Sequence, residues 1–267
     1  MLNNILLKTL RDQFRPILFW GIGLIALSVL MAAFFPSVQK SAVDLNKYLQ
    51  NLPEAFRTAL NASELDYSSA AGYINSELFS FMFPLIYLIY AVGFGSGVIG
   101  NEEAKGTLDL LLANPIPRWK VVLEKFIALV VSTLVISLIA WEGISLGAFL
   151  MKMNINLLRV ADINFSATLL AILFGTLALT LSCLKNSRGL ATGVTAAVVV
   201  LSYFLNVLAP LVESLKNLRK LSAFYYYNEN NPILNGLSLQ HVLVFVVAIL
   251  VILAIALFAF QRRDLGT

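Results

Sequence analysis

The chain alternates long apolar stretches with short polar ones. Six of the apolar stretches are long enough to cross a bilayer, whose hydrocarbon core of about 30 Å requires about 20 helical residues. The polar stretches between them are too short to fold as a separate soluble domain, so we expect one membrane domain over residues 1–267. The fold class predicted is an all-α integral membrane protein. Its transmembrane helices are expected at 16–35, 79–99, 121–150, 164–184, 189–212 and 239–260.

The first fifteen residues have a different pattern. Lys8, Arg11 and Arg15 alternate with apolar residues at helical intervals, which predicts an amphipathic helix lying in the membrane surface. A secretory signal peptide has a similar basic and then apolar opening. The apolar run 17–35 is longer than the apolar region of a normal signal peptide, and no Ala-x-Ala cleavage site follows it. We therefore expect the N-terminal segment to be retained.

Composition places the chain in the class of polytopic membrane proteins. Hydrophobic residues make up 59% of the 267 residues and charged residues only 13%, against about 45–50% and about 25% in soluble domains. The single cysteine, Cys183, excludes an intrachain disulfide and a cysteine metal cluster. The net charge of +4 is modest, and no interleaving of aromatic and basic residues suggests nucleic-acid binding. The bilayer is the first partner that the sequence implies.

Lysine and arginine positions predict the orientation. With the N-terminus inside, eleven of these residues are inner and eight are outer, and the outer ones are spread over much longer loops. Because the rule weighs charges near span ends in short loops, both termini are expected in the cytosol. The inner residues are Lys8, Arg11, Arg15, Lys105, Arg118, Lys120, Lys125, Lys185, Arg188, Arg262 and Arg263, and the outer ones are Lys40, Lys47, Arg57, Lys152, Arg159, Lys216, Arg219 and Lys220.

Two outer loops hold most of the sequence outside the spans. Residues 36–78 show an amphipathic helical pattern that is interrupted at Pro53, and we expect it to cap the outer face; a ligand-binding lid is the alternative. Residues 213–238 contain three consecutive tyrosines at 225–227, which fit an outer aromatic belt. A stacking site for a substrate ring is the sharper alternative there.

One charged stretch, 101–120, lies between the second and third spans and is typical of a short helix. Asn101 is suited to an N-cap, and Glu102 and Glu103 lie in the first turn, where the helix dipole favours carboxylates. Pro115 and Pro117 end the helix. Leu108, Leu111 and Leu112 form its apolar face, and Arg118, Trp119 and Lys120 follow as interfacial anchors for the next span. From these residues alone, the stretch could equally be a loop that only spaces two membrane helices.

This stretch resembles a segment of the permease subunits of type 2 ATP-binding-cassette (ABC) transporters. The pattern Glu-x-x-Gly-Thr-Leu-x-x-Leu-Leu is followed by Pro-x-x-Arg-Trp and a lysine early in the next span. The matching residues are Glu103, Gly106, Thr107, Leu108, Leu111, Leu112, Pro115, Arg118, Trp119 and Lys125. In that family the segment is a short cytosolic coupling helix between spans two and three, pressed against a separate ATPase subunit.

The resemblance implies roles for these residues. Glu102 and Glu103 would dock to basic residues of the ATPase, Gly106 would permit close backbone approach, and Thr107 belongs to the same coupling segment. Leu108, Leu111 and Leu112 would bury against the partner or the membrane. The family also implies two ATPase subunits, a second permease subunit in a homodimer, export as the direction, and the plasma membrane of a bacterium or archaeon.

No residue pattern suggests chemistry in this chain itself. The run 100–107 has its lysine before the glycine and lacks the spacing of a phosphate-binding loop. His241 is the only histidine, so a catalytic dyad or a zinc site has little support. We expect no enzyme activity, no catalytic residue, and no metal or cofactor site here. ATP and Mg²⁺ would be bound by the partner ATPase.

Glu142 is the one acidic residue well inside an apolar stretch. Carboxylates in hydrocarbon usually face protein or water, so Glu142 could line a transport pathway or form an interhelical hydrogen bond. Equally, it could reach water near the outer end of a long helix.

The function expected is therefore the permease subunit of an ATP-driven ABC exporter. The alternative is a stand-alone carrier or channel driven by an ion gradient, which normally has several ionisable residues inside the membrane. A membrane-embedded enzyme would need a cluster of polar catalytic residues at one depth. Glu142 alone supports neither alternative.

Overall fold

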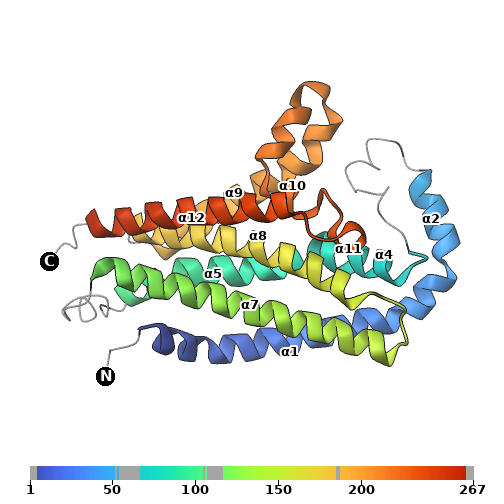
Figure 1. Cartoon of the computed structure of the whole chain (residues 1–267), viewed down its shortest axis with the longest axis horizontal. Helices are drawn as coiled ribbons and strands as arrows, with labels where there is room; N and C mark the ends of the chain where they lie inside the picture. The colour runs from blue at the N-terminus through green and yellow to red at the C-terminus, as the bar shows by residue number, and fades with distance from the viewer. Residues whose placement is uncertain are drawn as a thin grey trace.

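The computed structural model describes residues 5–51, 53, 67–104, 106, 117–184 and 187–262, and within these ranges all regular structure is helical. Six helices there are long and apolar enough to cross a membrane. They run side by side as one elongated bundle (Figure 1). In chain order the elements are α1 Ile5–Lys40, α2 Ala42–Gln50, α4 Ala70–Ile74, η1 Asn75–Met82, α5 Phe83–Ala104, α7 Arg118–Leu150, α8 Leu157–Leu184, α9 Arg188–Leu208, η2 Ala209–Leu211, η3 Glu213–Leu221, α10 Ala223–Asn228, α11 Pro232–Asn235 and α12 Leu239–Arg262.

The six predicted spans are confirmed as helices of spanning length, and most differ from prediction only at their ends. The first differs most. Residues 5–15, expected to form a surface helix of their own, are instead the first turns of α1, which continues through Pro16. The first turns are held by packing, since Ile5 is buried and the Leu6 N–H donates a hydrogen bond to Glu124 on α7 at 2.9 Å.

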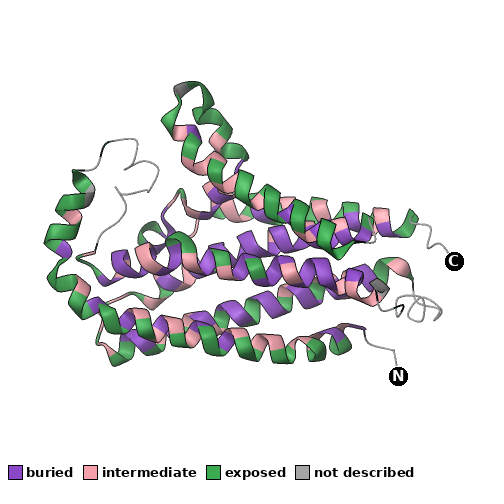
Figure 2. Ribbon diagram, turned by 180° about the vertical axis from the view of Figure 1, so that it is seen from behind, coloured by how far each residue is buried: buried purple, intermediate pink, exposed green. Residues whose placement is uncertain are grey.

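Helix α8 lies at the centre of the bundle. In its apolar stretch 78% of the residues are buried, the largest share among the six spans, whereas only 11% are buried in that of α9. The contrast is visible in Figure 2. Helix α5 packs on α8 along much of its length, α12 and α7 pack on it also, and α1 packs mainly on α7. The side chains that α8 buries include many small ones, which let neighbouring helices approach closely.

The closest approach of α5 and α8 is a glycine pair. A Cβ built on Gly95 would lie 2.1 Å from the carbonyl oxygen of Gly175, and one on Gly175 would lie 3.0 Å from the carbonyl oxygen of Ala91. Backbone therefore meets backbone at this crossing, where no side chain fits. Gly93, two residues earlier on α5, has nothing within 4 Å of its Cβ position.

A buried polar cluster joins α5, α7 and α8 deeper in the bundle. The Tyr87 hydroxyl donates to Asn164 Oδ1 at 2.6 Å, and Asn164 Nδ2 donates to the carbonyl and hydroxyl oxygens of Ser137 at 2.9 and 2.8 Å. Thr168 donates to the same hydroxyl at 2.6 Å. Each member thus has a partner, as polar groups require in a region that water does not reach.

The end of the bundle away from the two termini carries α2, α4, α10 and α11 (Figure 1). Helix α2 ends before Pro53, as the amphipathic pattern in 36–78 predicts, while residues 54–66 of that loop lie outside the described ranges. These short elements cover the far ends of the spans. The cap over the outer face and the ligand-binding lid both stay predictions.

The aromatic belt predicted at 225–227 is wrong for Tyr227. This side chain is 3% exposed, and its hydroxyl donates to the carbonyl oxygen of Phe79 in the π-helical segment η1 at 2.6 Å. Burial raises the pKa of the Tyr227 hydroxyl well above its ordinary value, so it stays protonated and able to donate. Tyr225 and Tyr226 instead pack their rings against His241.

We expect Gly95→Ala to destabilise the bundle, because the new methyl group would meet the Gly175 backbone rather than a side chain that can rotate away. A loss of about 1–3 kcal/mol in the free energy of unfolding is typical of such overpacking. Thermal unfolding of the detergent-solubilised protein measures it. Gly93→Ala is the matched control and should be neutral or slightly stabilising; equal losses from both substitutions would contradict the backbone contact.

Candidate functional site

The residues singled out by sequence gather at the end of the bundle that holds both termini. There α1 begins, α5 ends and α7 begins, and the segment that connects α5 to α7 leaves from the same place (Figure 1). Residues 105 and 107–116 of that segment lie outside the described ranges. The site can therefore be built from the helix ends on either side of it.

The expected N-cap at Asn101 is wrong, because residues 101–104 are the last turn of α5 rather than the start of a new helix. The helix continues past Gly100 with its polar side chains held by neighbouring helices. Asn101 Oδ1 accepts a hydrogen bond from Arg188 Nη1 on α9 at 3.1 Å. The Gly100 N–H donates to the Ser182 hydroxyl on α8 at 3.2 Å.

Glu102 forms an ion pair with Lys125 at the centre of this site. Lys125 lies two turns into α7, and its side chain is 1% exposed. Its Nζ is 3.0 Å from Glu102 Oε2 and donates to the carbonyl oxygen of Val98 at 2.6 Å. A buried ammonium group is costly without a counter-charge and hydrogen-bond acceptors. The end of α5 supplies both, which fixes it against α7.

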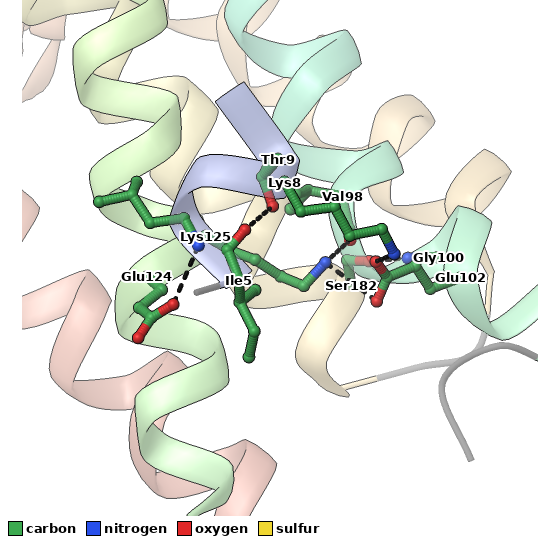
Figure 3. A network of polar contacts seen from close by, with 10 residues as sticks. Ile5, Lys8, Thr9, Val98, Gly100, Glu102, Glu124, Lys125 and Ser182 are labelled. Carbon is green, nitrogen blue, oxygen red and sulfur yellow. Dashed lines mark hydrogen bonds and ion pairs between the residues drawn. The ribbon is translucent and has the colours of Figure 1, made fainter. Parts of the chain in front are cut away.

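Helix α1 joins the same network (Figure 3). Lys8 Nζ lies 3.8 Å from Glu102 Oε1, and the Leu6 N–H donates to Glu124 Oε2 at 2.9 Å. Glu124 also pairs with Lys120, one turn earlier on α7, at 3.8 Å. Ends of three helices, α1, α5 and α7, are thus connected by two acidic residues, Glu102 on α5 and Glu124 on α7.

The remaining predicted coupling residues are only partly placed. Gly106 is exposed and has a φ of +65°, a left-handed conformation that favours glycine and ends the preceding helix. The Glu103 side chain lies outside the described part of the chain, as do Thr107, Leu108, Leu111 and Leu112. Their assigned roles stay predictions.

The predicted interfacial anchors form the first turn of α7. Trp119 is 44% exposed and Lys120 is exposed, while Arg118 is half-buried. A large amphipathic ring beside two cations at a helix end is the arrangement found at membrane interfaces. The anchor role is consistent with this placement and remains a prediction.

Glu142 lies on the exposed face of α7 and forms no hydrogen bond or ion pair with any residue in the described ranges. Its neighbours Gly143 and Gly147 face the other way, onto α1. A Cβ on Gly143 would lie 2.9 Å from the Ile25 Cα, and one on Gly147 would lie 2.7 Å from the Ala32 Cβ. The glycine pair therefore contacts α1, and Glu142 points away from the interior of this chain.

Sequence reasoning missed the roles of Lys125 and Glu124. The sequence places Lys125 only in the family pattern and among the inner charges, and it gives Glu124 no role. A signal was present, since a lysine inside an apolar span needs a carboxylate at the same depth. Glu102 ends the preceding span and is suitably placed for that purpose.

A group of three or more His, Cys, Asp or Glu side chains able to hold a metal ion is absent from the described residues. The polar groups at this end instead pair with one another or line a groove between α1 and α5. The arrangement serves to hold and position helices.

We expect Glu102→Gln to destabilise the protein by about 3 kcal/mol, because it leaves the buried Lys125 ammonium without a counter-charge. The double variant Glu102→Gln with Lys125→Met should lose less, since it removes both charges. Thermal unfolding in detergent measures both effects. Lys120→Met is the control, because its exposed pair with Glu124 is worth at most about 1 kcal/mol; a loss equal to that of Glu102→Gln would contradict the central role of the buried pair.

Comparison with curated proteins finds no match to the chain. The family model described as ABC-2 family transporter protein matches residues 3–265, nearly the whole chain. This match agrees with the six apolar helices of the bundle and with the resemblance of 101–125 to a permease segment. The chain therefore belongs to the ABC-2 family of transporter proteins and is a membrane-spanning permease of an ABC transporter.

Proposed function

We propose that this permease is an exporter subunit driven by a separate ATPase that docks at the end of the bundle holding both termini. That end faces the cytosol of a bacterial or archaeal cell, and the protein lies in the plasma membrane. The observation that carries the proposal is the charged network of Glu102, Lys125 and Lys8, which ties three helix ends together beside the segment 105–116.

The network supports a mechanical role for that segment. A partner that pushes on residues between α5 and α7 acts first on the last turn of α5 and the first turn of α7. Glu102 joins the last turn of α5 to Lys125, two turns into α7, and Lys8 and Glu124 extend the connection to α1. Displacement is therefore shared by three rigid helices, which can re-pack between discrete arrangements.

The individual roles follow from position. The leucines at 108, 111 and 112 bury against the ATPase, and Gly106 allows the chain to leave α5 in a left-handed turn. Arg118, Trp119 and Lys120 hold the start of α7 at the interface. Glu102 acts within the permease by positioning α5, so Glu103 remains the carboxylate for docking.

The assembly proposed contains two permease subunits, as a homodimer, and two ATPases. ATP and Mg²⁺ are bound and used by the ATPases. The exposed apolar faces of α9 and α12 support contact with lipid or a second permease, because their apolar stretches are only 11% and 22% buried within the chain. An ion-driven carrier has less support, since Lys125 is the one charged side chain buried in the described part and it is already paired.

The orientation is tested with two cysteine variants, Gly106→Cys and Lys216→Cys, since both positions are exposed and the native Cys183 is buried. A membrane-impermeant maleimide should label the cysteine introduced at position 106 only in inverted membrane vesicles. Intact spheroplasts should show the reverse, with label at position 216 only. Label at position 106 from outside the cell would overturn the proposed orientation.

The ATPase partner is tested by affinity purification of the tagged permease from its native membrane. An ATPase with a phosphate-binding loop should be recovered in a one-to-one ratio. Glu103→Lys should lower that recovery several-fold with thermal stability unchanged, because it reverses the charge proposed to dock the ATPase. Glu102→Gln is the comparison variant, and its main effect should be a lower thermal stability rather than a lower recovery of the ATPase. Repeated recovery of the wild-type chain without any ATPase would contradict the proposal.

A further inference from the structure

A groove of about 690 Å³ lies between α1 and α5 at the end that holds both termini. It forms because α1 packs mainly on α7 while α5 packs mainly on α8, so the two helices face each other without close backbone contact. Lys125 of α7 lines the groove between them, and Arg188 of α9 reaches it beside Gly97. The volume is within the range of about 300–1,000 Å³ that small-molecule sites occupy.

The groove is polar at its mouth and apolar further in. Lys8 and Asp12 on α1 lie near the helix end, and Trp20 lies three turns further into the bundle. On α5 the same change runs from Asn101 back to Ile89. Twelve residues separate the two ends on each wall, which is about 18 Å of helix. The groove is therefore long enough to extend from headgroup depth into the hydrocarbon layer.

The charges that line the mouth are not all paired with one another. Glu102 is 3.0 Å from Lys125 and 3.8 Å from Lys8. Asp12 on α1 and Arg188 on α9 also line the groove, and neither has an ion pair within 4 Å among the residues described. Arg188 donates one hydrogen bond, to Asn101, of the five that a guanidinium can give. Apart from Lys8, which pairs with Glu102, the α1 wall thus offers a carboxylate, and Arg188 offers a cation opposite it.

Glycine keeps the α5 wall open. A Cβ on Gly97 would lie 2.9 Å from Asn101 Nδ2 and 3.4 Å from Arg188 Nε, so Gly97 leaves room for the guanidinium. Gly93, one turn deeper, has nothing within 4 Å of its Cβ position and faces open space. A side chain larger than hydrogen at Gly93 would project into the groove.

We propose that this groove binds a zwitterionic amphiphile, with the anion of its headgroup at Arg188, the amine at Asp12 and its apolar part along Trp20 and Ile89. Two opposite charges on opposite walls match a headgroup that carries both charges, whereas a purely anionic headgroup would meet the Asp12 carboxylate. The apolar depth of the groove selects an amphiphile over a soluble zwitterion.

This site deepens the proposed function, on which its role as a cargo-loading site rests. Lys125 and Glu102 line the part of the groove where the headgroup would lie. The same pair joins the helices that the ATPase is proposed to move. An occupant would thus contact the same helices that receive the push. Binding itself needs no ATPase, so it can be tested on the permease alone.

The test measures lipid retained by the delipidated full-length protein in native mass spectrometry. The probes are phosphatidylethanolamine and phosphatidylglycerol with identical acyl chains, offered in equal amounts. We expect one phosphatidylethanolamine to be retained with roughly tenfold preference, and Asp12→Asn or Arg188→Gln to remove that preference. Gly93→Leu should abolish retention of either lipid by filling the groove. Soluble glycerophosphoethanolamine in excess should not displace the lipid.

Arg11→Gln is the matched control, because Arg11 is exposed at the same end of α1 and does not line the groove. It should leave the preference unchanged. Equal retention of the two lipids by the wild-type protein would overturn the zwitterionic headgroup. Displacement by the soluble headgroup would overturn the amphiphile, and retention unaffected by Gly93→Leu would place the lipid elsewhere. None of these outcomes depends on recovery of an ATPase, so failure here is distinct from failure of the proposed function.

Discussion

The ammonium group of Lys125 sets the main constraint at one end of this bundle. Buried in a span and 1% exposed, it is tolerated because a carboxylate lies at 3.0 Å and a backbone carbonyl at 2.6 Å. Both acceptors come from the last two turns of α5, so the helix must reach past Gly100 to satisfy the charge. The position of α5 relative to α7 is therefore fixed by an electrostatic requirement rather than by apolar packing alone.

Further into the bundle, close packing and buried hydrogen bonds replace charge. The Gly95–Gly175 crossing brings two backbones together, and the cluster around Asn164 joins three helices with every member partnered. Without water to compensate, each of these contacts has few alternatives. The interior is thus specified in detail, while the charged end combines a strong pair with weaker, exposed ones at Lys8 and Lys120.

The sequence allowed the spans to be predicted well, because their signal is local: a run of about 20 apolar residues is sufficient. It did not allow partners to be predicted. Gly143 and Gly147 suggested a helix contact, but only the structure identifies α1 as the other side. Tyr227 was placed in an aromatic belt, since three tyrosines near a span end give no indication of which one turns inward.

The candidate site shows the same limit. The sequence assigns Glu102 to docking and Lys125 to the family pattern rather than joining them as a pair, because the 22 intervening residues hide their proximity. The N-cap proposed at Asn101 failed for a related reason. Local capping chemistry favoured a new helix there, and contacts from α7, α8 and α9 extend the old one instead.

The low burial of α9 has a consequence for how the molecule opens. Only Ala191 and Thr195 are buried in this helix, both in its first half. Few contacts within the chain therefore oppose its release, and a local opening of α9 costs less free energy than unfolding of the whole bundle. Within the bilayer, α9 can therefore shift as a whole helix with its backbone hydrogen bonds intact, whereas α8 cannot move without disturbing most of its packing.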